Sequence, residues 1–366
     1  MTIGDMSSTW IVNTTSRRVS EAGIASLGLT PAPAGTILYS MYASVGLVAR
    51  LGTSAIWNQA ILGITPRLGV SARYLAYALD ALRPTLGKYL RSNTQNNLNA
   101  DVVGNLALNV PCEEEQRQIA DLLDAEIARI DALTAARKRQ VQLLREREAA
   151  VRDRSIAAAG APIRLARALR SILQGWSPEC EARVPDQGEW GVLKAGATNH
   201  AVFREEESKA LPSFLVPRAD LEVAPGDVLM SRANTRELAG SAAFVDTCRP
   251  RLMLSDKHYR VVPEPSKMHP RYLALILQSE QSRARIQAET VGSSASMQNI
   301  SQELVRDLRL PIPTLDSQVR IISICRRASE VTRAATVTID GSIALLRERR
   351  QALITAAVSG RVDVGG

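Results

Sequence analysis

Cysteine, histidine and aromatic residues are scarce in this 366-residue chain, which has 4 Cys, 3 His and 4% aromatic residues. The cysteines (Cys112, Cys180, Cys248 and Cys325) are scattered and form no CxxC pair. No histidine stands at metal-ligand spacing from them. We therefore expect neither a zinc site nor a disulfide framework, but buried or incidental thiols in a reducing compartment.

Long apolar runs and the common catalytic motifs are absent as well. No stretch reaches the length of a membrane span and no secretory leader follows Met1, so we expect a cytoplasmic protein with no membrane partner. The chain has no GxxxxGK(S/T) or GxGxxG loop, no (N/D)PP(Y/F) tetrapeptide of the amino-methyltransferase kind and no nucleophile elbow. Asp186, Glu189 and Lys194 lack the Glu-x-Lys arrangement of a nuclease core. The sequence thus predicts no catalytic residue, no metal and no cofactor on this chain.

Arginine is abundant, and the chain is basic. It has 45 Lys+Arg against 37 Asp+Glu, a formal net charge of +8 and a sequence pI near 9.6. Arginine greatly outnumbers lysine, and its planar guanidinium suits bidentate contacts to phosphate or guanine. The positive excess alone is weak support for a nucleic acid partner, because many basic proteins bind none.

The sequence occurs twice, at an offset of 202 residues. The eight matched pairs join Pro111, Gln116, Ile119 and residues 143–147 (LLRER) to Pro313, Gln318, Ile321 and residues 345–349 (LLRER). No gap separates the pairs, so the helix phase is unchanged. Such a duplication indicates a pseudo-twofold molecule, and these molecules usually bind something with two halves.

Each copy begins with short predicted strands and one helix. In the first copy we expect strands at 35–40, 55–65 and 106–110, and a helix at 71–82 whose leucines recur on one face. A polar loop at 91–100 precedes the last strand. The second copy repeats this order with a strand at 225–231, a helix at 271–277 and a polar loop at 292–301.

A long helix follows each of these regions, at 113–157 and at 316–359. Apolar residues recur in both at steps of 3 and 4, and about 44 residues at about 1.5 Å each give a length of roughly 65 Å. The apolar seam is too narrow for the face of a globular domain, so we expect the two helices to pair antiparallel. The candidate seam and docking residues are Ile119, Leu123, Ile130, Leu144, Ile339, Ile343, Leu346 and Leu353.

The ends of these helices resemble the conserved regions of type I restriction-modification specificity subunits. The residues that carry the resemblance are Pro111, 115–120 (EQRQIA) and 143–147 in the first copy, and 345–354 (LLRERRQALI) and 357–363 (AVSGRVD) in the second. The resemblance implies an α+β fold with two target recognition domains related by pseudo-twofold symmetry. Each domain is followed by one long α-helix of an antiparallel coiled coil.

The same resemblance implies a non-catalytic subunit that recognises a bipartite sequence in double-stranded DNA. Each recognition domain would read one half of the site. The helix pair would set the distance between the halves and dock methyltransferase subunits, and restriction and translocase subunits would join that core. S-adenosylmethionine, ATP and magnesium then belong to the partners, and no cofactor belongs to this chain.

We expect four parts. They are a first target recognition domain at 1–110, a central spacer helix at 111–160, a second recognition domain at 161–312, and a C-terminal spacer helix and tail at 313–366. The first domain is 42 residues shorter than the second and lacks a match to residues 164–190. A start at an internal Met, a trimmed product and a genuinely shorter domain all stay open. A strand left unpaired there would expose a sheet edge.

Polar side chains beside the predicted strands are the candidates for DNA contact, because such side chains read base edges while Lys and Arg on phosphates fix position. In the second domain Arg232 and Arg236 suit guanine or phosphate, and Asn234 suits adenine. The alternative for this segment is a solvated hairpin turn. The other candidates of this domain are Thr235, Lys194, Asn199 and Lys257.

In the first domain the candidates for DNA contact are Tyr39, Ser40, Tyr42, Arg91, Asn93 and Gln95. Their loops equally suit capping turns before the next strand and helix. Two further interpretations of the whole chain remain. One is a coiled-coil adaptor or relic that assembles with the methyltransferase but has lost reading of one half-site, and the other is a stand-alone nuclease or methyltransferase, which the missing motifs disfavour.

Overall fold

The computed structural model describes residues 1–6, 10–26, 28–42, 44–88, 97–289 and 298–362. The chain divides into two compact units. Unit 1 comprises Met1–Arg139 and Thr338–Gly366, and unit 2 comprises Gln140–Val337. Each unit therefore holds one globular part and a portion of each of the two long helices, α5 (Glu113–Ala157) and α9 (Leu315–Val358). The two predicted long helices are confirmed.

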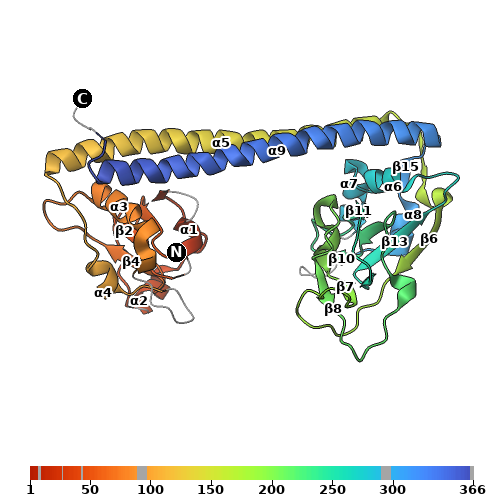
Figure 1. Ribbon diagram of the computed structural model, residues 1–366, viewed down its shortest axis with the longest axis horizontal. Coiled ribbons are helices and arrows are strands. Elements are labelled where there is room, and N and C mark those ends of the chain that lie inside the picture. Colours follow the sequence, from red (N-terminus) through yellow and green to blue (C-terminus); the bar gives the residue numbers. More distant parts are fainter. Residues whose placement is uncertain (7–9, 27, 43, 89–96, 290–297, 363–366) are drawn as a thin grey trace. The chain divides into compact units, whose positions relative to one another are not determined.

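The globular part of unit 1 is built on one four-stranded sheet with the order β1-β3-β2-β4 (Figure 1). Its strands are β1 (Ile11–Val12), β2 (Ile37–Ser40), β3 (Val48–Leu51) and β4 (Ile61–Ile64). Strand β2 runs antiparallel to both β3 and β4, and all four of its residues are buried. The helices are α1 (Ile3–Met6), α2 (Glu21–Ser26), α3 (Ala72–Ala81), η1 (Arg83–Lys88) and α4 (Ala100–Gly104).

The predicted helix at 71–82 is present as α3. Ser71 caps it, because its side-chain oxygen accepts a hydrogen bond from the backbone N–H of Tyr74. Tyr74 and Tyr77 are fully buried and join the seam residues of the long helices in one apolar cluster. Helix α3 thus attaches the sheet to the helix pair of its own unit.

The described part of unit 2 has a second four-stranded sheet, with the order β11-β9-β13-β6, and three smaller strand groups. Its strands are β5 (Pro162–Arg164), β6 (Leu169–Gln174), β7 (Gly191–Leu193), β8 (Ser208–Ala210), β9 (Val228–Ser231), β10 (Ala233–Asn234), β11 (Ala242–Phe244), β12 (Leu252–Met253), β13 (His258–Pro263), β14 (Gln298–Asn299) and β15 (Arg309–Pro311). Its short helices are η2 (Leu165–Ala168), η3 (Ala195–Ala201), η4 (Ala219–Leu221), α6 (Pro270–Leu277), α7 (Glu280–Glu289) and α8 (Gln302–Asp307).

The duplication seen in the sequence reappears in the strand order. The antiparallel set β3-β2-β4 of unit 1 matches the antiparallel set β11-β9-β13 of unit 2, and each set is followed by one helix, α3 or α6. In unit 2, β6 lies beside β13 and β5 pairs with β15. The described part of unit 1 has no counterpart of β5 or β6. The stretch 106–110, which we predicted as a strand, is not a strand. Its counterpart in unit 2 is β15, which pairs with β5, and the described part of unit 1 offers no such partner strand.

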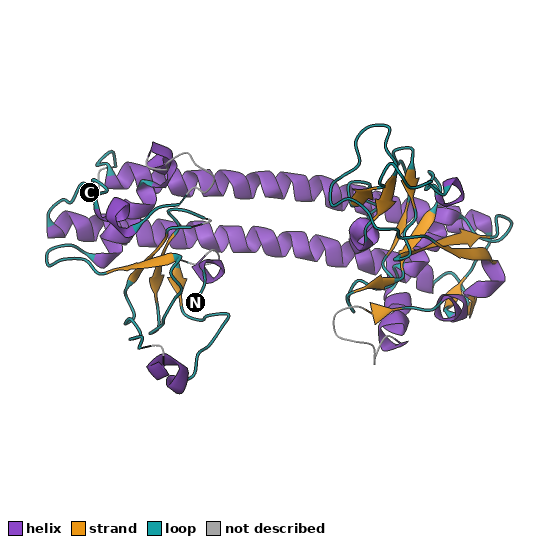
Figure 2. Ribbon diagram, turned by 90° about the horizontal axis from the view of Figure 1, so that it is seen from below, coloured by secondary structure: helices purple, strands orange, loops and turns teal. Residues whose placement is uncertain are grey.

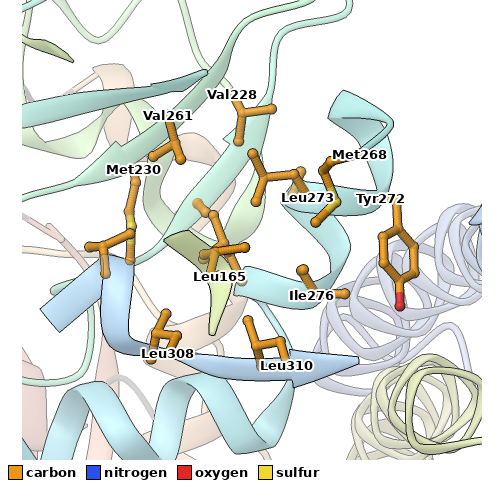
Figure 3. Close-up of a cluster of buried hydrophobic side chains, with 14 of the residues drawn as sticks. Leu165, Val228, Met230, Val261, Met268, Tyr272, Leu273, Ile276, Leu308 and Leu310 are labelled. Atoms are coloured by element: carbon orange, nitrogen blue, oxygen red, sulfur yellow. The ribbon is translucent and has the colours of Figure 1, made fainter. Parts of the chain in front are cut away.

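The core of unit 2 lies between its main sheet and helix α6. Figure 3 shows Val228, Met230 and Val261 of the sheet beside Leu273 and Ile276 of the helix. All of these side chains are buried, and they belong to the largest apolar cluster of the unit. This core fixes the buried strand β9 and thereby positions the segment that follows it, of which Thr235 and Arg236 are exposed.

Within each unit, α5 and α9 lie side by side (Figures 1 and 2). In unit 1, Ile119 shares a cluster with Ala357, whereas Glu126, further along α5, pairs with Arg349, which is earlier in α9, at 3.7 Å. In unit 2, Thr332 of α9 donates to the backbone oxygen of Leu144 at 3.5 Å, and the later part of α5 shares a cluster with the earlier part of α9. The predicted antiparallel pairing is therefore confirmed in each unit.

The predicted seam positions are all buried or half-buried. Ile119, Leu123, Ile130, Ile339 and Ile343 are buried, and Leu144, Leu346 and Leu353 are half-buried. The prediction missed the two most deeply buried seam residues of the C-terminal end, Ile354 and Ala357. No helix in the described ranges has the length and apolar character that a membrane crossing requires.

One glutamine fixes each globular part to its long helix. The side chain of Gln116 accepts from the N–H of Ser71 at 2.8 Å and donates to the backbone oxygens of Gly69 and Pro111. The equivalent Gln318 makes the same three bonds, with His269, Lys267 and Pro313. Both glutamines are buried, so each copy uses the same polar contact to place its sheet against the start of the helix.

Candidate nucleic-acid interface

The segment after β9 is a short strand and not the solvated hairpin turn of the alternative interpretation. Strand β10 pairs antiparallel with β14, and the N–H of Arg232 donates to the backbone oxygen of Lys257 at 2.7 Å. Arg232 is half-buried, and its guanidinium lies 3.4 Å from the backbone oxygen of Asp256. Thr235 and Arg236, which follow, are exposed. The structure thus brings Arg232 and Lys257 together and leaves the end of the segment in solvent.

Arg232 lines a groove of about 420 Å³, here called the polar groove. The groove is lined by Gln174, Arg232, Tyr259, Asn299, Ile300, Ser301, Gln302 and Glu303. Arginine, asparagine and glutamine are the residue types that form bidentate contacts to base edges. Neither Asn299 nor Gln302 was a predicted contact, although Asn299 stands in the predicted polar loop at 292–301 and Gln302 follows it directly.

Two buried side chains support the base of this groove. Tyr259 is buried, and its hydroxyl donates to the backbone oxygen of Ile300 at 2.9 Å, so it is a core residue that fixes one wall. His258 is fully buried, and its Nδ1 lies 2.9 Å from the hydroxyl of Ser255. Burial lowers the pKa of His258 to about 4, because the interior disfavours the charged ring. His258 is therefore neutral at physiological pH.

A second set of predicted residues meets beside η3. The amide of Asn234 donates to the side-chain oxygen of Asn199 at 2.9 Å and to the backbone oxygen of Ala195 at 3.1 Å. Lys194 precedes η3 and is half-buried, with its N–H bonded to the backbone oxygen of Glu207 at 2.8 Å. The structure therefore joins Asn199 and Asn234, which stand 35 residues apart.

The backbone at the end of η3 has an unusual conformation. His200 has φ 57° and ψ 31°, and Ala201 has φ 62°. Left-handed residues other than glycine are uncommon, and each costs on the order of 1–2 kcal/mol. Ser241 holds the segment, because its hydroxyl accepts from the N–H of Ala201 at 3.3 Å and donates to the oxygen of Thr198 at 2.7 Å.

The first-domain candidates are placed differently. Tyr39 and Ser40 are fully buried in β2, so a role in direct DNA contact does not fit their position. Burial and the nearby carboxylate of Asp80 raise the pKa of Tyr39 to about 12. Tyr42 is exposed, and its backbone oxygen accepts from the hydroxyl of Ser40 at 2.8 Å. The remaining candidates of this domain, Arg91, Asn93 and Gln95, lie outside the described residues.

Unit 2 also contains a cleft of about 750 Å³ between the helix pair and the globular part. Its apolar lining includes Phe244, Leu275 and Ile322. Its charged lining consists of Arg145, Glu148, Arg152, Asp246, Arg271, Arg326, Glu330 and Arg333. Five arginines and three carboxylates thus line the cleft, so positive side chains outnumber negative ones there.

Within the described ranges, the structure shows no cluster of three or more His, Cys, Asp and Glu that would hold a metal ion. The four cysteines are all free thiols. The two surfaces of unit 2, the polar groove and the η3 segment, present hydrogen-bond donors and acceptors. These groups can form directional hydrogen bonds to a partner.

Comparisons with known proteins agree with this chemistry. The family described as Type I restriction modification DNA specificity domain matches residues 3–143. The specificity subunit of the Escherichia coli type I restriction enzyme EcoEI is 33% identical over 161 residues, which are 44% of this chain and 27% of that subunit. The specificity subunit of the Methanocaldococcus jannaschii enzyme MjaIX is 29% identical over 132 residues, which are 35% of this chain and 29% of that subunit. The matched stretches thus span little more than a quarter of these curated relatives.

The fold of the chain is also similar to a solved structure described as the structural basis of complex assembly and conformational transition of the type I R-M system. The TM-score is 0.66 at 16% identity, and the likeness covers 90% of this chain and 83% of that one. Together these findings confirm the family that the repeated helix motifs predicted. Residues 3–143 match the type I restriction modification DNA specificity domain, and parts of the chain are similar to specificity subunits of type I restriction enzymes.

Proposed function

We propose that this chain is the DNA-recognition subunit of a type I restriction-modification complex and that it reads a bipartite site in double-stranded DNA. The observation that carries the proposal is the duplication within the fold. Each unit has the same three antiparallel strands and the same following helix, fixed to the helix pair by an equivalent glutamine. Two equivalent readers on one chain suit a site with two halves.

In unit 2, the polar groove is the surface that supports base reading. Arg232 stands there with Gln174, Asn299 and Gln302. These side chains offer both donors and acceptors at the surface, as readers of the major groove must. Lys257 is half-buried beside them, 3.3 Å from Asp256, and is suited to a phosphate contact that fixes position.

The partners of the proposed complex are methyltransferase subunits and, joined to them, restriction and translocase subunits. The repeated run LLRER supports two equivalent docking surfaces. Leu143 in unit 2 and Leu345 in unit 1 are 48% and 66% exposed, so packing inside the chain does not explain why both copies keep them. Large exposed apolar side chains with arginine neighbours are typical of protein interfaces. The catalytic activities and their cofactors then reside on the partners, and the complex works in the cytoplasm.

The experiment is to co-express the chain with its methyltransferase partner and to map every methylated adenine. We expect one bipartite sequence. Arg232→Ala should relax the sequence in one half-site only, whereas Arg285→Ala, an exposed arginine on α7, should leave it unchanged. Methylation scattered without sequence preference would contradict the proposal.

A second candidate function is an adaptor that assembles with the methyltransferase but reads only one half-site. The burial of Tyr39 and Ser40 favours it, since two predicted contacts of unit 1 are not at its surface. The same map separates the two functions. An adaptor of this kind would give methylated sequences with a preference in one half and none in the other.

A further inference from the structure

The side chain of Asn234 is fully used inside unit 2. Its Nδ2 lies 2.9 Å from the side-chain oxygen of Asn199, 3.1 Å from the backbone oxygen of Ala195 and 3.2 Å from the hydroxyl of Ser231. Its Oδ1 accepts from the N–H of Thr235 at 2.9 Å. A side-chain amide has two N–H donors, so these acceptors engage both. Asn234 therefore has no donor left for a base, although its residue type suits adenine.

The side chain of Asn199, unlike that of Asn234, is only partly engaged in hydrogen bonds. Its Oδ1 accepts from Asn234, and its backbone oxygen accepts from the guanidinium of Arg204 at 2.8 Å. Asn199 is half-buried, and its own Nδ2 makes no hydrogen bond to the described part of the chain. If the Asn199 amide were flipped, its N–H groups would face the N–H groups of Asn234. Asn234 therefore fixes which end of the Asn199 amide is the oxygen. That oxygen keeps a second lone pair.

The backbone beside Asn199 is held in place as well. His200 and Ala201 are both left-handed, and neither is a glycine. Ser241 holds this conformation through its bonds to Ala201 and Thr198. Strained conformations of this kind persist only where the surrounding structure holds them, and they gather at sites with a function. The result is a side-chain amide of fixed position and fixed polarity at the surface of unit 2.

We infer that Asn199 is a specificity-determining residue that reads an adenine, and that Asn234 is the positioning residue that holds it. In the major groove adenine presents the N7 acceptor beside the N6 donor, whereas guanine presents two acceptors. An amide with its polarity fixed matches the first pattern and mismatches the second. The inference rests on the proposed DNA-reading function of unit 2.

The test uses the full chain assembled with its methyltransferase partner and the DNA site that the wild-type complex methylates. Each adenine of the two half-sites is replaced in turn by 7-deazaadenine, which lacks the N7 acceptor. With the wild-type chain we expect one of these replacements to lower kcat/KM for methylation by roughly 10- to 100-fold. With Asn199→Ala the same replacement should have no further effect, because the donor that N7 meets is already gone.

Two more variants separate reading from folding. Asn199→Asp keeps the size and the acceptor but removes the donor, so it should behave like Asn199→Ala. Asn234→Asp keeps the bond to Thr235 but no longer donates to Asn199, so discrimination at the same adenine should fall. Affinity for DNA of unrelated sequence should not change with Asn199→Ala, because this variant leaves the charge of the surface unchanged. Asn105→Ala is the matched control, because Asn105 is the C-cap residue of α4 in unit 1 and its amide donates to the backbone oxygen of Asp101.

Two negative outcomes are distinct. If the wild-type complex methylates without sequence preference, the proposed function itself fails. If the wild-type complex reads a defined site but Asn199→Ala and Asn199→Asp keep the full 7-deazaadenine effect at every adenine, only the role of Asn199 is overturned.

Discussion

Because His258 is buried, it makes the stability of unit 2 depend on pH, which a histidine at the surface would not do. Its ring is fully buried, and its pKa is about 4 against an ordinary value of 6.5. The unfolded chain binds a proton at this residue below pH 6.5, whereas the folded chain does so only near pH 4. Stability is therefore lost as the pH falls through this window, by about 2 kcal/mol between pH 7 and pH 5. Urea unfolding at the two pH values measures this loss.

The control for this prediction is His258→Gln, which has no titrating group and keeps a side-chain acceptor near Ser255. The wild-type chain should lose more stability than the variant on going from pH 7 to pH 5. Equal losses in the two proteins would show that other groups cause the pH dependence. The variant also reports on the polar groove, since His258 pairs in the sheet with Ser231, which precedes Arg232.

At the scale of residues, the sequence predicts which residue types suit DNA contact better than it predicts whether their polar groups are free to make that contact. Arg232 and Asn199 were candidates from their residue types, and the structure leaves both at the surface of unit 2. Tyr39 and Asn234 were candidates for the same reason, but Tyr39 is buried and Asn234 is fully hydrogen-bonded inside the unit. Whether a polar group is already used depends on contacts between distant segments, and no local pattern gives those.

At the scale of elements, the C-terminal helix separates residues that hold the chain together from residues that face outward. Ile354 is fully buried in the seam of unit 1, and Leu345 is 66% exposed. We expect Ile354→Ala to lower the free energy of unfolding by about 2–4 kcal/mol, because it leaves a cavity. Leu345→Ala should change it by less than about 0.5 kcal/mol but weaken binding of the methyltransferase subunit. Urea unfolding and co-purification measure the two effects.

Leu143→Ala, the equivalent change in unit 2, should behave like Leu345→Ala, since both copies of LLRER leave this position exposed. Equal docking defects would support two equivalent surfaces. A destabilised Leu345→Ala chain, or full assembly with both leucines removed, would contradict the assignment of these residues to a partner.

The elements themselves were predictable to different degrees. Helix α5 begins and ends at the predicted residues, and α9 differs from its prediction by one residue at each end. Both helices were predictable because their apolar spacing repeats over many turns without interruption. Strands β10 and β14 have two residues each, so neither contains a full alternation. Their pairing, which forms part of the polar groove, comes from tertiary contact and leaves no signal in the sequence.

At the scale of the whole molecule, the offset of 202 residues predicted the duplication, and the matching strand orders of the two units agree with it. Identical residues, Gln116 and Gln318, make identical bonds in the two units. Comparison of the two copies predicted that the first lacks a match to residues 164–190, where β6 lies, but it did not predict β1 beside β3. Unit 2 adds β6 beside β13, whereas unit 1 adds β1 beside β3. Equivalent helices can thus carry unlike surfaces, as two half-sites of different sequence require.

We propose in addition that the helix pair sets the spacing of the half-sites, as the resemblance to specificity subunits implies. The pair can be lengthened without breaking its seam. The change is an insertion of 22 residues, two 11-residue repeats, after Arg139 in α5 and after Val337 in α9. Two such repeats return the seam nearly to its starting phase. At about 1.5 Å per residue they add about 33 Å, close to one turn of DNA at roughly 34–36 Å. The mapped site should then keep both half-sequences and gain a spacer longer by about ten base pairs.

Two controls test the physical basis of this prediction. A seven-residue insertion in both helices also keeps the seam but adds only about 10 Å, which turns the second half-site by roughly a third of a DNA turn, so methylation should fall sharply. An insertion in α5 alone leaves 22 residues without a partner helix and should impair assembly. A 22-residue pair of insertions that left the mapped spacer unchanged would show that something other than the helices sets the distance, and the helix pair would then be a docking element only.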